Sequence, residues 1–402
     1  INQFLAGVRN HIRLVCGPLP DFLEGRFSNG TNVGLQYDTS TKCHKIQKPT
    51  MTEGAKYLAQ WLMPHAWERA LLESKSSMSS FLVKSEKFGT VPKNFKTDRT
   101  IGVQPVWNLY LQLGIGSHLR HRLLRKANID LKHGQSTHMR IASVGSRNGD
   151  IATIDLKNAS NSVSRKVVEL LFPREWFELL DTVRCPSIDI DGETHRLEMF
   201  SAMGNGFTFE LQTILYWAVC RQCGVSEPLV YGDDIIVPTE YAIDVCSALK
   251  YLGFAINESK TFVDGPFRES CGGNSFLGWD VTPFRLTKLP TEPSDWISIH
   301  NGLSLRIPYA WRARLTALAQ IPFAIRRCVG PRLLGDIVLH TPDWRQGTVP
   351  ERHIPRVLTW TRTKLSGRRI PLVLGRGTGM TFCYAYLPIG IKIPFDRVGG
   401  AG

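Results

Sequence analysis

Two acidic positions in this sequence have the residue types and spacing that a metal-dependent reaction would need. The first is Gly232-Asp233-Asp234, which lies inside the otherwise apolar segment 229–237. Glycine followed by aspartate suits a two-residue type II′ hairpin turn, so we expect Asp233 at the tip and Asp234 at the start of the returning strand. Adjacent carboxylates repel each other unless a cation or hydrogen bonds compensate. Taken alone, an ordinary polar turn is the more common explanation of such a pair.

The second acidic position is Asp155, which ends the alternating segment 151–156. If that segment is a strand beside the hairpin, Asp155 and Asp233 converge on one point with Asp234 next to them. Oxygen donors without His or Cys are typical of a hard cation such as Mg²⁺, which takes its other ligands from water and substrate phosphates. Two such ions, for which Mn²⁺ can substitute, activate an attacking hydroxyl and stabilise a leaving oxygen. The three aspartates therefore predict magnesium-dependent nucleotidyl transfer.

A glycine-rich segment, residues 201–210, lies between these carboxylates and leads into a predicted helix. Its glycines allow a ligand to approach the backbone closely, and the start of a helix favours anions. Asn205 offers both a hydrogen-bond donor and an acceptor. A helix N-terminus with a flexible lead-in is the alternative interpretation of this segment.

Three of these segments, in this order and spacing, resemble motifs A, B and C of viral RNA-dependent RNA polymerases. The resemblance is closest to the catalytic (beta) subunit of the replicase of single-stranded RNA bacteriophages, the levivirus group that includes coliphage Q-beta. The segments that carry it are 155–160, 203–210 and 231–234, supported by 91–99, 112–116 and 265–272. The similarity covers roughly residues 80–285. It departs from the family at Asn161, where the Q-beta pattern has an acidic residue.

The resemblance implies an α+β fold, a right-handed fingers–palm–thumb polymerase with an antiparallel palm sheet. It assigns residues 1–150 to the fingers, 151–284 to the palm with 184–206 partly in the fingers, and 285–402 to a thumb-like region. It implies template-directed RNA synthesis for viral genome replication and transcription, with release of pyrophosphate. Its substrates would be template RNA and nucleoside triphosphates, in the host bacterial cytoplasm. Its partners would be host elongation factors Tu and Ts and a small-subunit ribosomal protein.

The resemblance also gives roles to single residues. Asp155, Asp233 and Asp234 would bind the metal, and Lys260 in motif D would protonate pyrophosphate, although a surface lysine explains Lys260 equally well. Asn205 would sense the ribose 2′-hydroxyl, because an unpaired buried amide disfavours deoxyribose. The predicted nucleotide-binding residues are Lys93, Lys96 and Arg99 of the basic loop 84–99, and Ser201, Gly204, Asn205, Gly206 and Thr208.

Composition and charge exclude several other classes of protein. Apolar residues make up 43% of the 402 residues, which excludes intrinsically disordered and fibrous proteins. The net charge of +14 is concentrated in residues 285–402, which hold 18 basic and 6 acidic side chains. A solvated basic surface would explain this excess, but it favours a phosphate-rich partner such as template and product RNA. The arginines that we expect to bind RNA there are Arg306, Arg312, Arg314, Arg326 and Arg327.

The nine cysteines and the apolar pattern bear on the compartment. The cysteines are odd in number and scattered, as in reduced intracellular proteins. No apolar run is long enough to predict a membrane span. Because the sequence begins at Ile1 rather than Met, we expect a fragment of a longer chain.

The spacing of apolar residues predicts the elements that position these side chains. We expect strands over 151–156 and 274–281 and a hairpin over 229–237. We expect helices over 51–82, 107–124, 162–171, 207–223, 242–252 and, more loosely, 308–320 and 351–365.

Two alternative functions stay open. A reverse transcriptase-like DNA polymerase could share the palm carboxylates, but Gly232 and Asn205 favour ribonucleotides. A catalytically inactive RNA-binding protein could use the basic C-terminal region, but it would have little reason to retain all three carboxylates.

Overall fold

The computed structural model describes residues 2–36, 40–73, 78–93, 96–286, 288–307, 309–341, 350–351 and 354–355. The chain divides into two compact units, one made of Ile1–Pro92 and Asp98–Thr282, the other of Lys93–Thr97 and Pro283–Gly402. The boundaries expected for fingers, palm and thumb stay a prediction.

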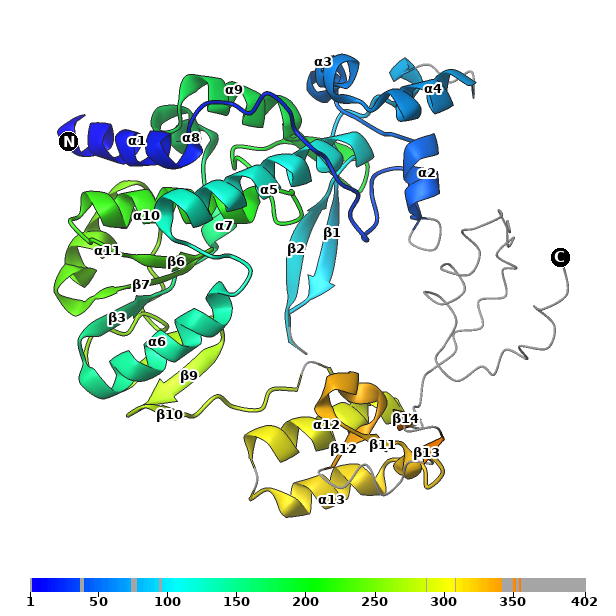
Figure 1. Cartoon of the computed structure of the whole chain (residues 1–402), viewed down its shortest axis with the longest axis vertical. Helices are drawn as coiled ribbons and strands as arrows, with labels where there is room; N and C mark the ends of the chain where they lie inside the picture. The colour runs from blue at the N-terminus through cyan, green and yellow to red at the C-terminus, as the bar shows by residue number, and fades with distance from the viewer. Residues whose placement is uncertain are drawn as a thin grey trace, which may run out of the picture. The chain divides into compact units, whose positions relative to one another are not determined.

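Figure 1 labels the elements. The helices of the first unit are α1 (Asn2–Cys16), α2 (Lys42–Gln47), α3 (Glu53–Leu62), α4 (His65–Glu73), η2 (Met78–Phe81), α5 (Val106–Ala127), α6 (Gly134–Asn148), α7 (Ala159–Ser162), α8 (Arg165–Leu171), α9 (Arg174–Val183), α10 (Thr208–Gln222), η3 (Thr239–Tyr241) and α11 (Ala242–Tyr251). Its strands are β1 (Glu86–Pro92), β2 (Asp98–Val103), β3 (Ile151–Ile154), β4 (Ser187–Ile190), β5 (Glu193–Arg196), β6 (Leu229–Tyr231), β7 (Asp234–Pro238), β8 (Phe267–Ser270), β9 (Gly273–Phe276) and β10 (Trp279–Asp280).

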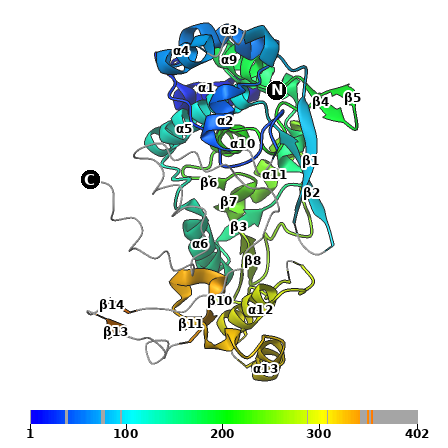
Figure 2. The same cartoon turned by 90° about the vertical axis from the view of Figure 1, so that its right-hand side faces the viewer.

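The predicted hairpin over 229–237 and the predicted strand over 151–156 lie in one antiparallel sheet. Its strand order is β3-β7-β6, with Ile154 of β3 opposite Ile235 of β7. Residues 256–262 run along the other side of β3, where Thr153 and Phe262 exchange backbone hydrogen bonds. Helix α10 packs against β6, α11 against β3, and α6 against β3, β8 and β9 (Figures 1 and 2).

The core of the first unit surrounds α10, which is buried on nearly all sides from Thr208 to Cys220. A helix that is apolar all round belongs in the interior of a fold. Helices α1 and α5 pack against α10 and against each other. The predicted helices over 107–124 and 207–223 are confirmed as α5 and α10.

Four sequence expectations about elements are wrong. Residues 84–99 contain β1 and the start of β2, which pair as an antiparallel hairpin with Val91 opposite Arg99, rather than a loop. Thr90, Val91, Thr100 and Ile101 are β-branched residues, which favour strands. The helix expected over 51–82 is interrupted between α3 and α4, where Met63 adopts extended backbone before Pro64. The strand expected over 274–281 is a second hairpin, because Leu277 and Gly278 both have positive φ and turn the chain. The helix expected over 162–171 begins only at Arg165, because Ser164 caps α8 by accepting a hydrogen bond from the Val167 N–H.

The second unit contains the small apolar cluster Ile297, Ile321 and Leu339. Helix α12 was not expected, although Pro293 occupies its first turn and Glu292 and Asp295 form a capping box, a recognised helix start. Of the helix expected over 351–365, only 351 and 354–355 are described, and they are strand. The elements of this unit are α12 (Pro293–Arg306), α13 (Trp311–Ala319), η4 (Ile325–Arg327), η5 (Arg332–Ile337), β11 (Val329–Gly330), β12 (Leu339–His340), β13 (Pro350–Glu351) and β14 (Ile354–Pro355).

The predicted α+β class with an antiparallel sheet carrying the carboxylates is confirmed. In the part of the chain that the structure describes, no helix is both long and apolar enough to cross a bilayer.

Candidate active site

The Gly232-Asp233 turn joins β6 to β7 and has the expected form. Tyr231 pairs with Asp234, which makes Gly232 and Asp233 the two loop residues. Gly232 has a φ of 65°, as the first central position of a type II′ turn requires. Its amide donates to the Thr213 hydroxyl of α10 over 3.0 Å, and a Cβ at this position would overlap the ring of a phenylalanine on the same helix. Contacts with α10 therefore hold the turn in place.

The strand register brings Asp155 to the same end of the sheet. Because Ile154 lies opposite Ile235, continuing the ladder by one residue puts Asp155 opposite Asp234, and side chains in that relation have Cβ atoms about 5 Å apart. Asn257 holds Asp155 from the other side: its Nδ2 donates to Asp155 Oδ2 over 2.6 Å, and its backbone N–H donates to the Asp155 carbonyl over 2.9 Å. Sequence reasoning missed Asn257, which is 102 residues away from its partner.

Asp234 is held by β8 and α6. The backbone N–H of Cys271 donates to Asp234 Oδ1 over 2.8 Å, and the Ser270 hydroxyl donates to the same oxygen over 3.3 Å. His138 Nδ1 lies 3.0 Å from that hydroxyl oxygen. Since the serine donates its single proton to the carboxylate, the histidine nitrogen is the donor in this second bond. Burial lowers the pKa of His138 to about 4, so the imidazole is neutral.

Burial and mutual repulsion both act on these acids. Burial and, to a smaller extent, the charges of Asp233 and Asp155 raise the pKa of Asp234 to about 6, against the hydrogen bond from Cys271, which lowers it. Burial also raises the pKa of Asp155, whereas the hydrogen bond from Asn257 and the charge of Lys260 lower it. Three carboxylates that disfavour one another's charge in this way form a place where a cation would be stabilised.

The donor set fits Mg²⁺. The three aspartates offer only carboxylate oxygens, the ligands that Mg²⁺ prefers. The Cys271 thiol is also near, as a hydrogen-bond partner of Asp234. Within the described ranges, no three or more His, Cys, Asp or Glu side chains are gathered tightly enough to enclose a metal on their own. An open carboxylate set suits an ion that completes its shell with water and substrate phosphate oxygens.

The glycine-rich loop before α10 presents Asn205, which is 9% exposed. Asn205 Oδ1 accepts from the Phe207 N–H over 3.0 Å, so the Nδ2 donors are the atoms that can reach a ligand. The Thr208 hydroxyl donates to Ser201 Oγ over 2.8 Å and ties the two ends of the loop together. Gly204 has a φ of 111°, which a side chain would strain.

The cationic residues predicted to bind the nucleotide or pyrophosphate belong to both units. Lys260 lies near Asp155 and forms an ion pair of 3.3 Å with Glu269, with its side chain 46% exposed. Arg99 is exposed on β2, in the first unit. Lys93 and Lys96 are in the segment assigned to the second unit, so their predicted contact with a nucleotide stays a prediction.

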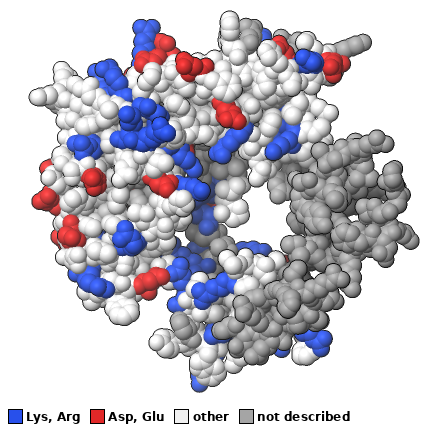
Figure 3. Space-filling view, in the orientation of Figure 1, with Lys and Arg blue, Asp and Glu red and all other residues white. Residues whose placement is uncertain are grey.

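Arginine and lysine side chains lie on the surface of the second unit in Figure 3. The Arg312 guanidinium stacks 5.2 Å from the Trp311 ring centroid, and that of Arg327 lies 5.8 Å from the Phe323 ring. Arg326 instead donates to backbone carbonyls at the end of α13, which makes it a structural cap. Arg306 is the last residue of α12, and Arg314 is only partly exposed on α13. RNA binding by these five arginines stays a prediction.

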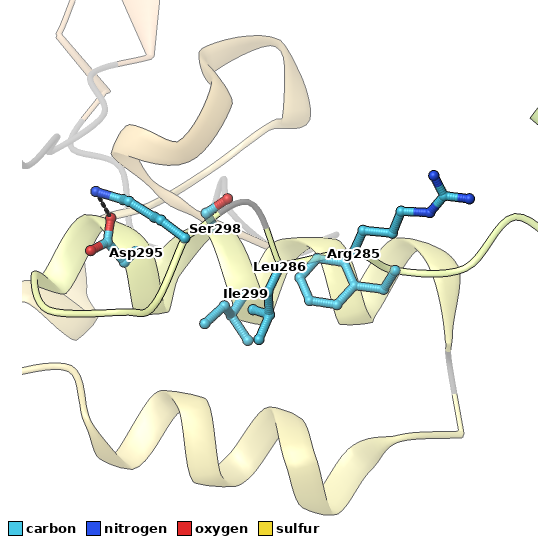
Figure 4. A pocket seen from close by; sticks show the side chains of 7 residues that line it. Arg285, Leu286, Asp295, Ser298 and Ile299 are labelled. Carbon is cyan, nitrogen blue, oxygen red and sulfur yellow. Dashed lines mark ion pairs between the residues drawn. The ribbon is translucent and has the colours of Figure 1, made fainter. Parts of the chain in front are cut away.

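A pocket of about 100 Å³ opens beside α12, far too small for a nucleotide. Lys288 and Asp295 form an ion pair of 2.6 Å at its wall. Figure 4 shows that the Arg285 guanidinium points away from this pair. None of the predicted site residues lines this pocket.

Comparison with known proteins agrees with the resemblance that the motifs carry. The family described as "RNA replicase, beta-chain" matches residues 6–311. The RNA-directed RNA polymerase subunit beta of Enterobacteria phage SP is 41% identical over 298 residues, covering 72% of this chain and 50% of that protein. The RNA-directed RNA polymerase beta chain of Escherichia phage MS2 is 39% identical over 296 residues, covering 72% of this chain and 52% of that protein. The chain thus spans about half the length of these relatives.

Similarity to solved structures is weaker. The RNA-dependent RNA polymerase of a human picobirnavirus aligns with a TM-score of 0.40 and 12% identity, over 59% of this chain and 52% of that one. Such values add nothing to the sequence match. The family match, in contrast, extends over about three quarters of the sequence and includes all three aspartates. The chain belongs to the RNA replicase beta-chain family.

Proposed function

We propose that this chain is the polymerase part of a phage replicase and joins ribonucleotides on an RNA template by two-metal nucleotidyl transfer. The observation that carries the proposal is the register that sets Asp155 opposite Asp234 beside the Asp233 turn, in a chain of the RNA replicase beta-chain family. Asp155, Asp233 and Asp234 would hold the magnesium ions. Bound there, the metal would polarise the phosphate and neutralise the charge that develops on it.

The chain's own residues have distinct tasks in this proposal. Asn257 and Cys271 orient Asp155 and Asp234, so that neither carboxylate has to be ordered when substrate binds. Lys260 is within electrostatic range of Asp155 and is proposed to donate a proton to the departing pyrophosphate. Asn205 would donate from Nδ2 to the 2′-hydroxyl oxygen of the incoming ribonucleotide, because its Oδ1 is already engaged.

Primer extension on a homopolymeric RNA template with Mg²⁺ tests the activity. We expect UTP incorporation by the chain, loss of incorporation in Asp233→Asn with RNA binding retained, and wild-type incorporation in Asp244→Asn. Asp244 is a matched control, because it is exposed on α11. A preference for dTTP over UTP would favour the reverse transcriptase alternative. RNA binding with no synthesis under any condition would favour the inactive RNA-binding alternative.

The partners are part of the same proposal. Elongation factors Tu and Ts and a small-subunit ribosomal protein are expected from the family resemblance, and the beta naming of the relatives indicates more than one subunit. Adding these three proteins to the assay should raise synthesis by the chain. Equal synthesis with and without them would contradict their role.

A further inference from the structure

One face of α5 lies against the loop that presents Asn205. Gln112, Gly116 and Arg120 are four residues apart and therefore share that face, which we call the α5 stripe. Gln112 and Gly116 are in a segment that the sequence singled out but that has no task in the proposed chemistry. Each member of the stripe meets the chain between 206 and 210.

The contacts of the stripe follow one another up the helix. Gln112 Oε1 accepts from the Gly206 N–H over 3.1 Å. Gly116 faces the Gly206 carbonyl so closely that a Cβ would overlap its oxygen. Arg120 pairs with the buried carboxylate of Glu210 over 2.6 Å. The loop and the first turn of α10 therefore rest on α5 at three successive levels.

Backbone groups fix the orientation of the Gln112 amide. The Gly206 N–H can only donate and the Val183 carbonyl can only accept, so Oε1 must face Gly206 while Nε2 donates to Val183 over 2.9 Å. Nε2 also donates to Gln104 Oε1 over 3.0 Å. Gln104 in turn donates to Glu86 and to a backbone carbonyl. Gln104 thus helps to orient the amide of Gln112, and Glu86 and the backbone carbonyl orient the amide of Gln104.

We propose that Gln112 is a positioning residue for ribose selection: its bond to Gly206 fixes the loop of residues 203–206 and so holds Asn205 in place to meet a 2′-hydroxyl. Gln104 supports it as the second member of the chain. This inference rests on the proposed function, since it assigns Gln112 to the site where Asn205 would read the sugar. Neither glutamine touches the substrate.

Hydrogen exchange tests the positioning without any need for activity. In Gln112→Met the Gly206 amide loses its acceptor, so its exchange, followed by mass spectrometry of short peptides spanning 203–207, should become about five- to tenfold faster. Gly116→Ala provides a second route, because its Cβ must displace the Gly206 carbonyl while alanine favours the helix. It should speed the same exchange.

Nucleotide selection is the second readout. The ratio of kcat/KM for UTP to that for dTTP should fall about tenfold in Gln112→Met and less in Gln104→Met, because Gln104 lies one bond farther from the loop. The fall should come from faster use of dTTP rather than from a uniform loss of rate. A merely structural role would lower both rates together.

Asn108→Leu is the matched control. Asn108 is a fully buried amide on the same helix, and its Nδ2 donates to the same Val183 carbonyl over 2.9 Å, but it bonds Thr52 instead of the loop. It should lose stability comparably while leaving Gly206 exchange and the UTP/dTTP ratio unchanged. Unchanged exchange in Gln112→Met, or an equal change in Asn108→Leu, would overturn the inference. A wild-type chain that makes no RNA would refute the proposed function, whereas exchange at Gly206 would still decide whether Gln112 holds the loop.

Discussion

Replacing Glu86 by glutamine should make the protein more stable at alkaline pH. Glu86 opens β1 and is 2% exposed. Its Oε2 accepts from Gln104, whereas Oε1 has no hydrogen-bond partner among the residues described. Burial raises its pKa to about 7 from an ordinary 4.5, against the Gln104 hydrogen bond and the charge of Arg184, which both lower it. A carboxyl in this position is stable in the folded protein mainly when it is protonated.

The sign and size of the effect follow from proton linkage. Between about pH 4.5 and about pH 7 the folded state binds more protons at Glu86 than the unfolded state does, so stability falls as the pH rises through this window. At 1.36 kcal/mol for each pH unit, the loss is about 3 kcal/mol. Glutamine is neutral at every pH and can still accept from Gln104, so Glu86→Gln should not suffer this loss.

Thermal unfolding of both proteins at pH 5 and pH 8 measures the difference. For a chain of this size we expect the Tm of Glu86→Gln to exceed that of the wild type by roughly 3 °C more at pH 8 than at pH 5. Glu240→Gln, at an exposed position, should show no such gain. A Tm difference that stays constant between the two pH values would refute the argument that Glu86 is buried as an acid.

Three further predictions concern other residues. Arg268 is fully buried and donates to the carbonyls of Ile151, Val263, Gly265 and Phe267, so Arg268→Met should leave these oxygens unpaired and destabilise the fold by about 3 kcal/mol or more, seen as a large drop in Tm. Lys260→Ala should slow the chemical step by ~10²–10⁴-fold and Lys260→His should shift the pH optimum, and equal single-turnover rates for wild type and Lys260→Ala would end its role as an acid. Reversing Arg312 and Arg327 to Glu should weaken the binding of unrelated RNAs alike and reduce the salt slope by roughly 1.4, at −0.7 for each phosphate contact; Arg326→Glu should instead lower the Tm, because Arg326 caps α13.

Local patterns in the sequence were sufficient to predict the elements that carry the carboxylates. Alternation over 151–156 and the Gly232-Asp233 turn depend on residues within a few positions, and both lie where the pattern put them. Where two signals competed, the prediction failed. The basic charge, the proline and the glycine of residues 84–99 favoured a loop, although β-branched residues such as Val91 and Ile101 occur in both β1 and β2. The helical period over 51–82 hid the break at Pro64.

The supports of the carboxylates could not be predicted, because nothing in the sequence links a side chain to a partner far along the chain. Asp155 depends on Asn257, 102 residues later, and Asp234 on the backbone of Cys271, 37 residues later. In each case the fold brings a hydrogen-bond donor from the segment 256–271 to an aspartate that the sequence pattern had already identified. A donor that is already held in place needs no reorganisation when charge develops. The segment 256–271 therefore orients the two acids in addition to pairing with β3. It sets the direction in which Asp155 and Asp234 face, and the proposed metal site therefore depends on residues that carry no catalytic signature of their own.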